Sequence, residues 1–179
     1  AFLITWLWKW YQKGVDTDQA KQKMSWKDVG IILLFYLAGR VIAVAGTVIN
    51  QLVSGNQMSM NDQAIFGLTV GLNEGFLPFT ICFLLVIGIV APIIEELVFR
   101  GLASQLLFSG GNKWLAAIVT SLIFGLLHAS NLIEWIMYTG LGIVFYLAYA
   151  RRRNIKDSIL LHMLNNIPSA IFIAFTIFS

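Results

Sequence analysis

The sequence predicts an all-α polytopic membrane domain, on three observations. Of the 179 residues, 58% are hydrophobic and 12% are charged, whereas soluble domains carry about 25% charged residues. The mean hydropathy is +0.78, and several apolar runs reach the ~20 residues that cross a bilayer. The alternating pattern and hairpin turns that mark β-strands are absent from the sequence.

Each apolar run predicts one helix. The first full span is expected at about residues 29–53, and a polar loop at 54–63 follows it. The later helices are expected at residues 64–75, 78–108, 114–130, 132–150 and 158–178. The turn SGGNK and the charged stretch RRRNIKD interrupt the apolar pattern between them, as glycine-rich and polar clusters do.

The chain is expected to divide into residues 1–28 and residues 29–179. AFLITWLW, at the start, is too short to span a membrane and lacks the layout of a signal peptide. It is expected to be either the trimmed end of an earlier span or an interfacial tryptophan-rich helix. The segment from Lys9 to Lys27 is polar and basic, and we expect it to be a solvated connector to the membrane-embedded domain.

Lysine and arginine in short loops predict the orientation of the spans. The basic connector, Lys113 and the cluster at 151–156 should share one side, because the loops at 54–63 and 129–134 hold neither residue type. We therefore expect the basic loops in the cytoplasm. No basic and aromatic patch predicts nucleic-acid binding, and the single cysteine, Cys82, excludes an internal disulfide and a CxxC motif.

Ionisable groups inside a membrane are costly, so each one marks a candidate functional site. Glu95, Glu96 and Arg100 lie in the stretch APIIEELVFRG of one expected helix, and the only two histidines, His128 and His162, lie on two others. Adjacent helical residues diverge by about 100°, so the two glutamates should have different tasks. Glu96 and Arg100 have the spacing and order of a favourable ion pair, which leaves Glu95 free for chemistry.

The spacing of Glu95 and His128 predicts that they meet. They are 33 residues apart, and the midpoint between them falls in the turn SGGNK. In an antiparallel hairpin both would therefore lie roughly 25 Å from that turn. By the same count, His162 lies nearer to the turn that precedes its helix. To bring His162 level with Glu95 in the membrane, the last helix must be tilted or must have an extended start.

Three motifs contain these residues. EELVFR fits EExxxR, FGLLH fits FxxxH and HMLNN fits HxxxN. In this order and on hydrophobic helices, they resemble the CPBP family of intramembrane proteases, which covers CAAX prenyl endopeptidases and bacteriocin-processing enzymes and whose bacterial members are often called Abi proteins. The resemblance covers about residues 78–170, the expected protease core.

The resemblance implies a glutamic protease without an obligatory metal or other cofactor. It implies that Glu95 and His128 activate a water and that His162 and Asn166 stabilise the oxyanion. Peptide hydrolysis does need a base and donors to the developing charge, and His162 and Asn166 project from one helix face at i, i+4. Phe124, four residues before His128, is expected to pack beside it and to limit its rotamers.

Two alternatives stay open. Two histidines and a glutamate could bind zinc with one open position, which would make the protein a metal-dependent membrane protease, although HExxH is absent. The protein could instead be a non-catalytic membrane regulator that binds the transmembrane helices of a partner. Glu96 and Arg100 could serve chiefly as a buried polar network that holds helices together.

Four further residues are expected to shape the membrane domain. Arg40 stands within the first span and could pair with Glu74 or a motif glutamate, or lie in a water-filled cavity. Glu134 is expected at the outer interface. Pro92 and Pro168 cannot donate a backbone hydrogen bond, so each is expected to kink its helix beside the motif residues.

These observations predict hydrolysis of a peptide bond in a membrane-associated peptide or protein, at a site reached from the cytoplasmic side. Whether the substrate is lipid-modified, as a prenylated CAAX protein is, stays open, and so does the oligomeric state. The small size favours a bacterial cell membrane and a peptide-processing or bacteriocin-immunity setting.

Overall fold

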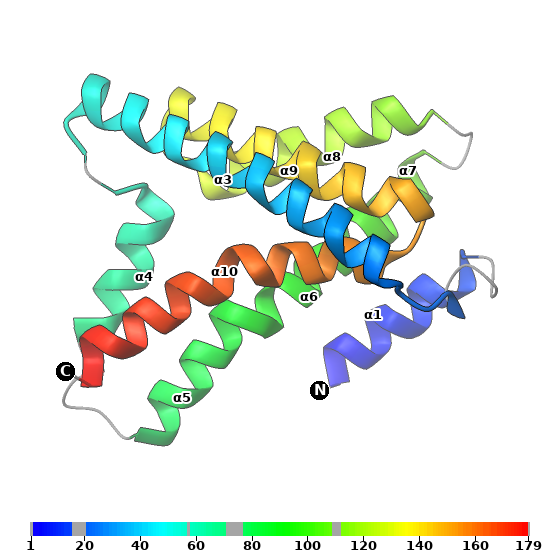
Figure 1. Cartoon of the computed structure of the whole chain (residues 1–179), viewed down its shortest axis with the longest axis horizontal. Coiled ribbons are helices and arrows are strands. Elements are labelled where there is room, and N and C mark those ends of the chain that lie inside the picture. Colours follow the sequence, from blue (N-terminus) through cyan, green and yellow to red (C-terminus); the bar gives the residue numbers. More distant parts are fainter. Residues whose placement is uncertain (1, 16–20, 57, 71–76, 109–111, 179) are drawn as a thin grey trace.

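The computed structural model describes residues 2–15, 21–56, 58–70, 77–108 and 112–178, which form helices and their connections without a strand (Figure 1). The helices are α1 (Phe2–Lys13), α3 (Trp26–Ser54), α4 (Met60–Val70), α5 (Leu77–Leu85), α6 (Ala91–Glu96), α7 (Ser104–Leu107), α8 (Lys113–His128), α9 (Leu132–Arg152) and α10 (Ile155–Phe178). Two π-helical segments, η1 (Val86–Val90) and η2 (Leu97–Ala103), join α5 to α6 and α6 to α7. The predicted all-α class is confirmed.

The multi-pass character follows from the lengths of these helices. Within the described residues, four stretches are long and apolar enough to cross a membrane, namely Trp26–Ser54, Leu77–Leu107, Leu132–Arg152 and Ile155–Ile177. The apolar helix α8 has 16 residues. At 1.5 Å per residue it is about 24 Å long, which is shorter than the ~30 Å hydrocarbon core.

Helix α9 forms the centre of the packing. It contacts α3 and α8, while α10 diverges from α9 after their turn and packs along the α5–α6 stretch (Figure 1). The α9 side chains Tyr138, Leu141 and Phe145 are buried in the main core. A Cβ atom at Gly142 would lie 3.0 Å from the Cβ of Ser121 on α8, so this glycine lets the two helices approach closely.

Pro92 accounts for the first π-helical segment. In η1 the N–H of Ala91 donates to the carbonyl of Val86, five residues earlier. With the same spacing of five residues, the donor to the carbonyl of Ile87 would be residue 92, which is a proline and has no N–H. The series of backbone hydrogen bonds is therefore interrupted directly before the motif glutamates. Pro168 lies inside α10, which continues through it as a helix.

The N-terminal region is more ordered than the expected solvated connector. Helix α1 continues to Lys13, and it buries Leu7 and Tyr11 in a small core with Leu97 and Ile155. The first span begins at Trp26, and Ser25 caps it by accepting from the N–H of Asp28 at 3.2 Å. With this cap the helix starts three residues before the expected start at 29, so the connector ends early.

The helix expected at residues 64–75 begins earlier, at Met60, because Ser59 accepts a hydrogen bond from the N–H of Asp62 at 3.2 Å and ends the preceding loop. Residues 71–75 of that prediction lie outside the described residues, and so does Glu74. A pairing of Arg40 with Glu74 therefore stays a prediction.

Glu134 lies in the first turn of α9, and its residue exposure is 1%. Its expected place at the outer interface of the membrane stays a prediction. Oε1 accepts from Asn50 Nδ2 of α3 at 3.3 Å, and Oε2 accepts from the N–H of Ser130 at 3.0 Å. Because the carboxylate satisfies donors of the α8–α9 turn and of α3, its burial ties these three helices together.

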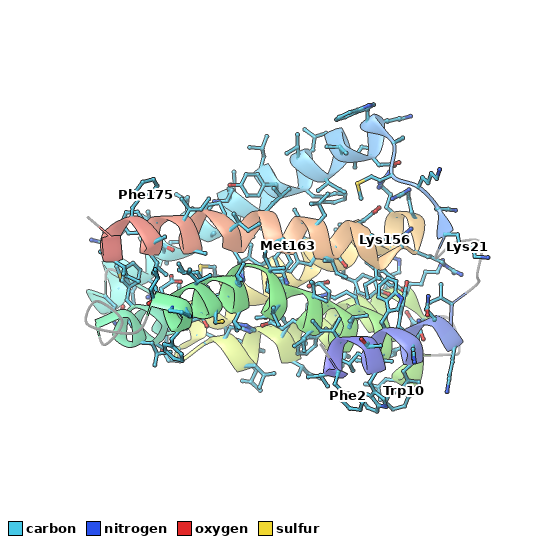
Figure 2. The ribbon with its side chains drawn as sticks, turned by 90° about the horizontal axis from the view of Figure 1, so that it is seen from below. Phe2, Trp10, Lys21, Lys156, Met163 and Phe175 are labelled. Atoms are coloured by element: carbon cyan, nitrogen blue, oxygen red, sulfur yellow. The ribbon has the colours of Figure 1, made fainter. Side chains whose placement is uncertain are left out.

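Basic side chains gather at one end of the molecule. Lys21 and Lys156 lie at the same end, and Phe175 lies at the opposite end (Figure 2). Arg151 pairs with Asp28 of α3 at 2.7 Å, and Arg152 Nε donates to Asp157 at 2.8 Å. These ion pairs fasten the start of α3 and the start of α10 to the end of α9.

Candidate active site

Three chemically active side chains from three helices converge. Oε2 of Glu95, on α6, lies 3.7 Å from Nε2 of His128 at the end of α8, and 3.7 Å from Nε2 of His162 on α10. The meeting of Glu95 with His128 predicted from the hairpin spacing is thus observed. His162 reaches the same point because α10 tilts away from α9 (Figure 1), which is one of the two solutions left open by the spacing.

The two glutamates differ in environment, as their angular separation predicts. The side chain of Glu95 is 27% exposed, whereas that of Glu96 is fully buried. Glu96 Oε1 accepts from Arg100 NH1 at 2.9 Å, and Arg100 NH2 donates to the carbonyl of Gly142 on α9 at 2.9 Å. The predicted Glu96–Arg100 pair is therefore present, and it also fastens η2 to α9.

Glu96 has a second partner that the spacing did not indicate. His162 Nδ1 lies 2.9 Å from Glu96 Oε1. An ionised carboxylate only accepts hydrogen bonds, so Nδ1 carries a proton and donates. The carboxylate of Glu96 therefore orients the ring of His162 so that Nε2 faces Glu95.

The ring of His128 is oriented in a similar way. Its Nδ1 lies 2.8 Å from the carbonyl oxygen of Phe124, and a carbonyl also accepts only. Nδ1 is thus the protonated nitrogen, and in the neutral ring Nε2 presents a lone pair to Glu95. The ring of Phe124 stacks on that of His128 with 4.3 Å between centroids, the contact that its spacing predicts.

Aromatic rings enclose the charged groups. Phe145 of α9 stacks on His162 with 4.4 Å between centroids, and the Arg100 guanidinium lies 4.8 Å from the centroid of Phe124. Cations are attracted to the faces of such rings. The rings therefore partly compensate for the removal of Arg100 from water and limit the movement of both histidines.

Asn166 lies on the same face of α10 as His162, and its amide already has one partner. Asn166 Nδ2 donates to the carbonyl of Ile87 at 3.2 Å. This is the carbonyl that loses its donor in η1 because residue 92 is a proline. The second hydrogen of the amide remains for another acceptor.

These residues line an internal cavity of about 740 Å³. Glu95, His128, His162 and Asn166 all contribute to its wall, together with apolar side chains from α3, α4, α9 and α10. Arg40 lines the same cavity, and a cavity is one of the places expected for this residue. It adds a cation that is not part of the three motifs. Glu96 and Arg100 stand behind the wall, fully buried.

The same three side chains are the possible ligands of a metal ion. Within the described residues, no group of three or more histidine, cysteine, aspartate or glutamate side chains is already arranged as a metal site. The Nε2 atoms of His128 and His162 nevertheless both lie 3.7 Å from Oε2 of Glu95, and two donor atoms at that separation can both lie ~2.0–2.2 Å from one ion.

The fold and this cluster define a polytopic helical membrane protein with a glutamate–histidine site at an internal cavity. Residues 77–168 match the family described as type II CAAX prenyl endopeptidase Rce1-like. That match includes the three motifs. No solved structure matches the chain.

Curated relatives agree with this match. YdiL of Bacillus subtilis, whose name describes a membrane peptidase, is 32% identical over 143 residues, which are 77% of this chain and 55% of YdiL. MroQ of Staphylococcus aureus, named a membrane-embedded CAAX protease, is 35% identical over 130 residues, or 69% of this chain and 49% of MroQ. The UPF0177 protein YxdF of Lactococcus lactis is 30% identical, with 72% and 71% of the two chains covered.

The chain therefore belongs to the CPBP family of CAAX protease-like membrane peptidases. It spans about half the length of YdiL and MroQ.

Proposed function

We propose that the protein is an intramembrane endopeptidase that hydrolyses a peptide bond in a membrane-associated peptide or protein. The convergence of Glu95 with the Nε2 atoms of His128 and His162 on one cavity carries the proposal. Membership of a membrane peptidase family supports it. The apolar lining of the cavity suits a hydrophobic substrate segment, and the proposal leaves open whether that substrate carries a lipid.

Glu95 and His128 would activate the attacking water. The 3.7 Å between Glu95 Oε2 and His128 Nε2 exceeds a direct hydrogen bond, and a water can bridge polar atoms at such a separation. Both atoms accept in the neutral-histidine state, so a bridging water would donate to each. Glu95 then takes a proton from the water as its oxygen attacks the scissile carbonyl, and His128 fixes the position of that oxygen.

His162 and Asn166 would stabilise the oxyanion. Nε2 of His162 faces the cavity beside Glu95, and in the imidazolium form this nitrogen carries a hydrogen that it can donate to the oxyanion. The free hydrogen of the Asn166 amide can serve as the second donor. Preorganised donors of this kind lower the barrier by roughly 3 kcal/mol each.

A metalloprotease is the second candidate, favoured by one specific feature. Each histidine donates its Nδ1–H, one to a carbonyl and one to a carboxylate, as histidines that bind metals through Nε2 commonly do. Oε2 of Glu95 would complete three ligands and leave a position for water.

Chelation distinguishes the two candidates. Purified protein in detergent would be assayed on an internally quenched apolar peptide before and after treatment with EDTA or phenanthroline. The glutamate mechanism predicts unchanged hydrolysis. Loss of hydrolysis that zinc restores would favour the metalloprotease, and absence of hydrolysis by the wild-type protein on every apolar peptide tried would favour the non-catalytic regulator.

We further propose that the basic loops face the cytoplasm and that substrate enters from that side. The clustering of Lys21 and Lys156 at one end of the molecule (Figure 2) supports this orientation, since basic loops favour the cytoplasmic side. A bacterial peptide-processing or bacteriocin-immunity setting also remains a proposal.

A further inference from the structure

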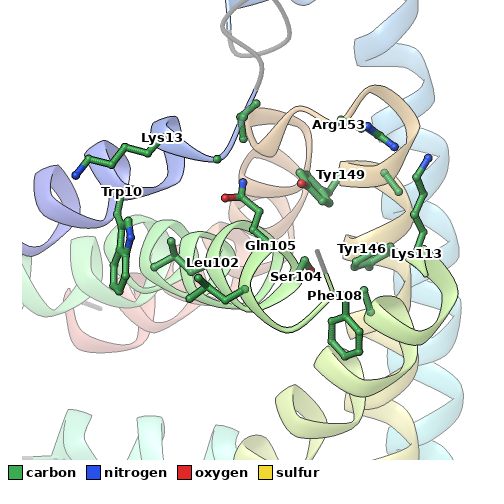
Figure 3. Close-up of a pocket in the computed structure, with 15 residues that line it drawn as sticks. Trp10, Lys13, Leu102, Ser104, Gln105, Phe108, Lys113, Tyr146, Tyr149 and Arg153 are labelled. Carbon is green, nitrogen blue, oxygen red and sulfur yellow. The ribbon is translucent and has the colours of Figure 1, made fainter. Parts of the chain in front are cut away.

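A second cavity, distinct from the one that holds the glutamate–histidine cluster, lies at the basic end of the molecule. Its volume is about 680 Å³, and it lies between α1, α7 and the facing ends of α8 and α9 (Figure 3). Its described lining includes Lys13, Lys113 and Arg153 but no aspartate or glutamate. The described part of the lining therefore carries an excess of positive charge.

Its cations have no ion-pair partner in the described part of the chain, where no carboxylate lies within 4.0 Å of Lys113 or Arg153. The neighbouring arginines differ, because Arg151 and Arg152 are both neutralised by Asp28 and Asp157. Lys113 and Arg153 lie on the same side of the cavity in Figure 3, and Lys13 lies on the other. Among the described residues, the charge without an ion-pair partner is thus concentrated where α8 begins and α9 ends.

The two cations differ in their positions on the helices. Lys113 is the first residue of α8, and the positive end of a helix dipole repels a cation there. Arg153 adopts φ 52°, ψ 35° at the end of α9, a left-handed conformation that glycine and asparagine adopt most easily, although its charge suits the negative end of the α9 dipole. Lys113 therefore gains no helix stability from its charge, which suits a ligand.

The remainder of the lining is amphipathic. Trp10, Phe108, Tyr146 and Tyr149 contribute aromatic surface, and Gln105 extends into the cavity from α7 (Figure 3). The adjacent side chains of Leu106 and Trp114 are 61% and 71% exposed. Tryptophans of this kind are enriched at the level of lipid headgroups, and basic pockets between membrane helices bind anionic headgroups.

We propose that this cavity is a binding site for a phosphate group, occupied by the headgroup of an anionic phospholipid. The phosphate lies between Lys113 and Arg153, near the positive end of the α8 dipole, which attracts anions. The acyl chains follow the exposed apolar side chains around Leu106. This site is independent of the peptidase chemistry proposed above.

Binding can be measured by native mass spectrometry and by thermal shift on the full chain in a neutral detergent. The probes are dioleoyl phosphatidylglycerol, dioleoyl phosphatidylcholine and inorganic phosphate. The test variant is Lys113→Gln with Arg153→Asn, since asparagine tolerates the left-handed conformation. The control is Lys9→Gln with Lys27→Gln, which removes the same charge from two exposed lysines that do not line the cavity.

Phosphatidylglycerol should bind to and stabilise the wild type and the control variant more than phosphatidylcholine does. The test variant should bind it about 30-fold more weakly, about 2 kcal/mol at 1.4 kcal/mol per tenfold, because each basic residue contributes about 1 kcal/mol near a lipid surface. Equal binding by the test and control variants would overturn the site. Equal stabilisation by the two lipids would also overturn it. If inorganic phosphate alone gave the full thermal shift, and the test variant lost that shift, the ligand would be free phosphate and not the headgroup of a lipid.

Discussion

Oε1 of Glu96 contacts Arg100 and His162, and only the contact with Arg100 follows from the spacing of the motif. Arg100 is four residues along the same helix, so the i, i+4 rule identifies it. His162 is on α10, and only the packing of α10 against α6 brings its Nδ1 within 2.9 Å of Glu96. Glu96 is therefore a positioning residue for His162 as well as the counter-ion of Arg100.

Glu96→Gln should consequently lower both stability and activity. The substitution leaves Arg100 without its buried carboxylate partner, which costs about 3–5 kcal/mol when such a pair is broken. It also removes the carboxylate that accepts from Nδ1 of His162 and orients its ring, so kcat should fall more than KM rises. Thermal unfolding and steady-state kinetics on the same preparation check this. A variant with normal kcat and lowered Tm would restrict Glu96 to the structural role.

His162→Ala and Asn166→Ala test the oxyanion assignment. Each should lower kcat by about 10²- to 10³-fold with little change in KM, because a donor used only in the transition state affects turnover. The double variant should lose less than the product of the two single losses, since both donors serve one oxygen. A raised KM with intact kcat for Asn166→Ala would assign that residue to substrate binding.

At the residue scale, the sequence identified the side chains that converge and missed how they are held. Ionisable residues are rare in apolar spans, so Glu95, His128 and His162 were prominent, and periodicity placed His162 and Asn166 on one face. The carbonyl partner of Asn166 and the stacking of Phe145 on His162 depend on contacts between helices far apart in sequence. No local pattern encodes those contacts.

At the scale of the elements, the interrupted helix from Leu77 to Leu107 is the main departure from expectation. The sequence predicted one long helix with a kink at Pro92, but the structure has two π-helical segments, η1 and η2, on either side of the motif glutamates. A proline removes one donor, and the surrounding packing decides whether a kink or a wider turn results. Within η1 the carbonyl of Ile87 has lost the backbone donor at residue 92, and it accepts a hydrogen bond from the amide of Asn166 instead.

This arrangement predicts energetic coupling between Pro92 and Asn166. Asn166→Ala should lower stability by about 1 kcal/mol, the usual contribution of one hydrogen bond. In a Pro92→Ala background the N–H of residue 92 can occupy the Ile87 carbonyl, so the same substitution should cost less. A double-mutant cycle of unfolding free energies measures the difference. Additive losses would show that the Asn166–Ile87 hydrogen bond does not compensate for the proline.

The N-terminal and α8–α9 regions show why boundaries and burial were harder to predict. Helix α1 is short and basic in sequence, yet Tyr11 is buried and contacts Gly101 of η2. Glu134 is acidic and close to a turn, yet it is buried with Asn50. In both cases contacts with other helices bury a polar side chain whose local sequence does not predict burial.

At the scale of the whole molecule, the multi-pass helical character was predicted from composition and the gathering of basic residues at one end from loop charge, whereas the orientation remains a prediction. In a Cys82→Ser background, Lys27→Cys and Asn56→Cys place single thiols near opposite ends of α3. An impermeant maleimide should label Asn56→Cys in intact bacteria and Lys27→Cys only after permeabilisation. The reverse pattern would invert the proposed orientation.

The central claim is that Glu95 activates water for peptide hydrolysis at the cavity. It is tested most directly by kcat on an internally quenched apolar peptide, measured for the wild type, Glu95→Gln and Glu95→Asp with equal Tm as the criterion for folding. We predict that Glu95→Gln abolishes hydrolysis and leaves Tm nearly unchanged, because the side chain of Glu95 is 27% exposed, whereas that of Glu96 is fully buried and paired with Arg100. We also predict that Glu95→Asp retains a fraction of the hydrolysis. Full hydrolysis by folded Glu95→Gln would contradict the account.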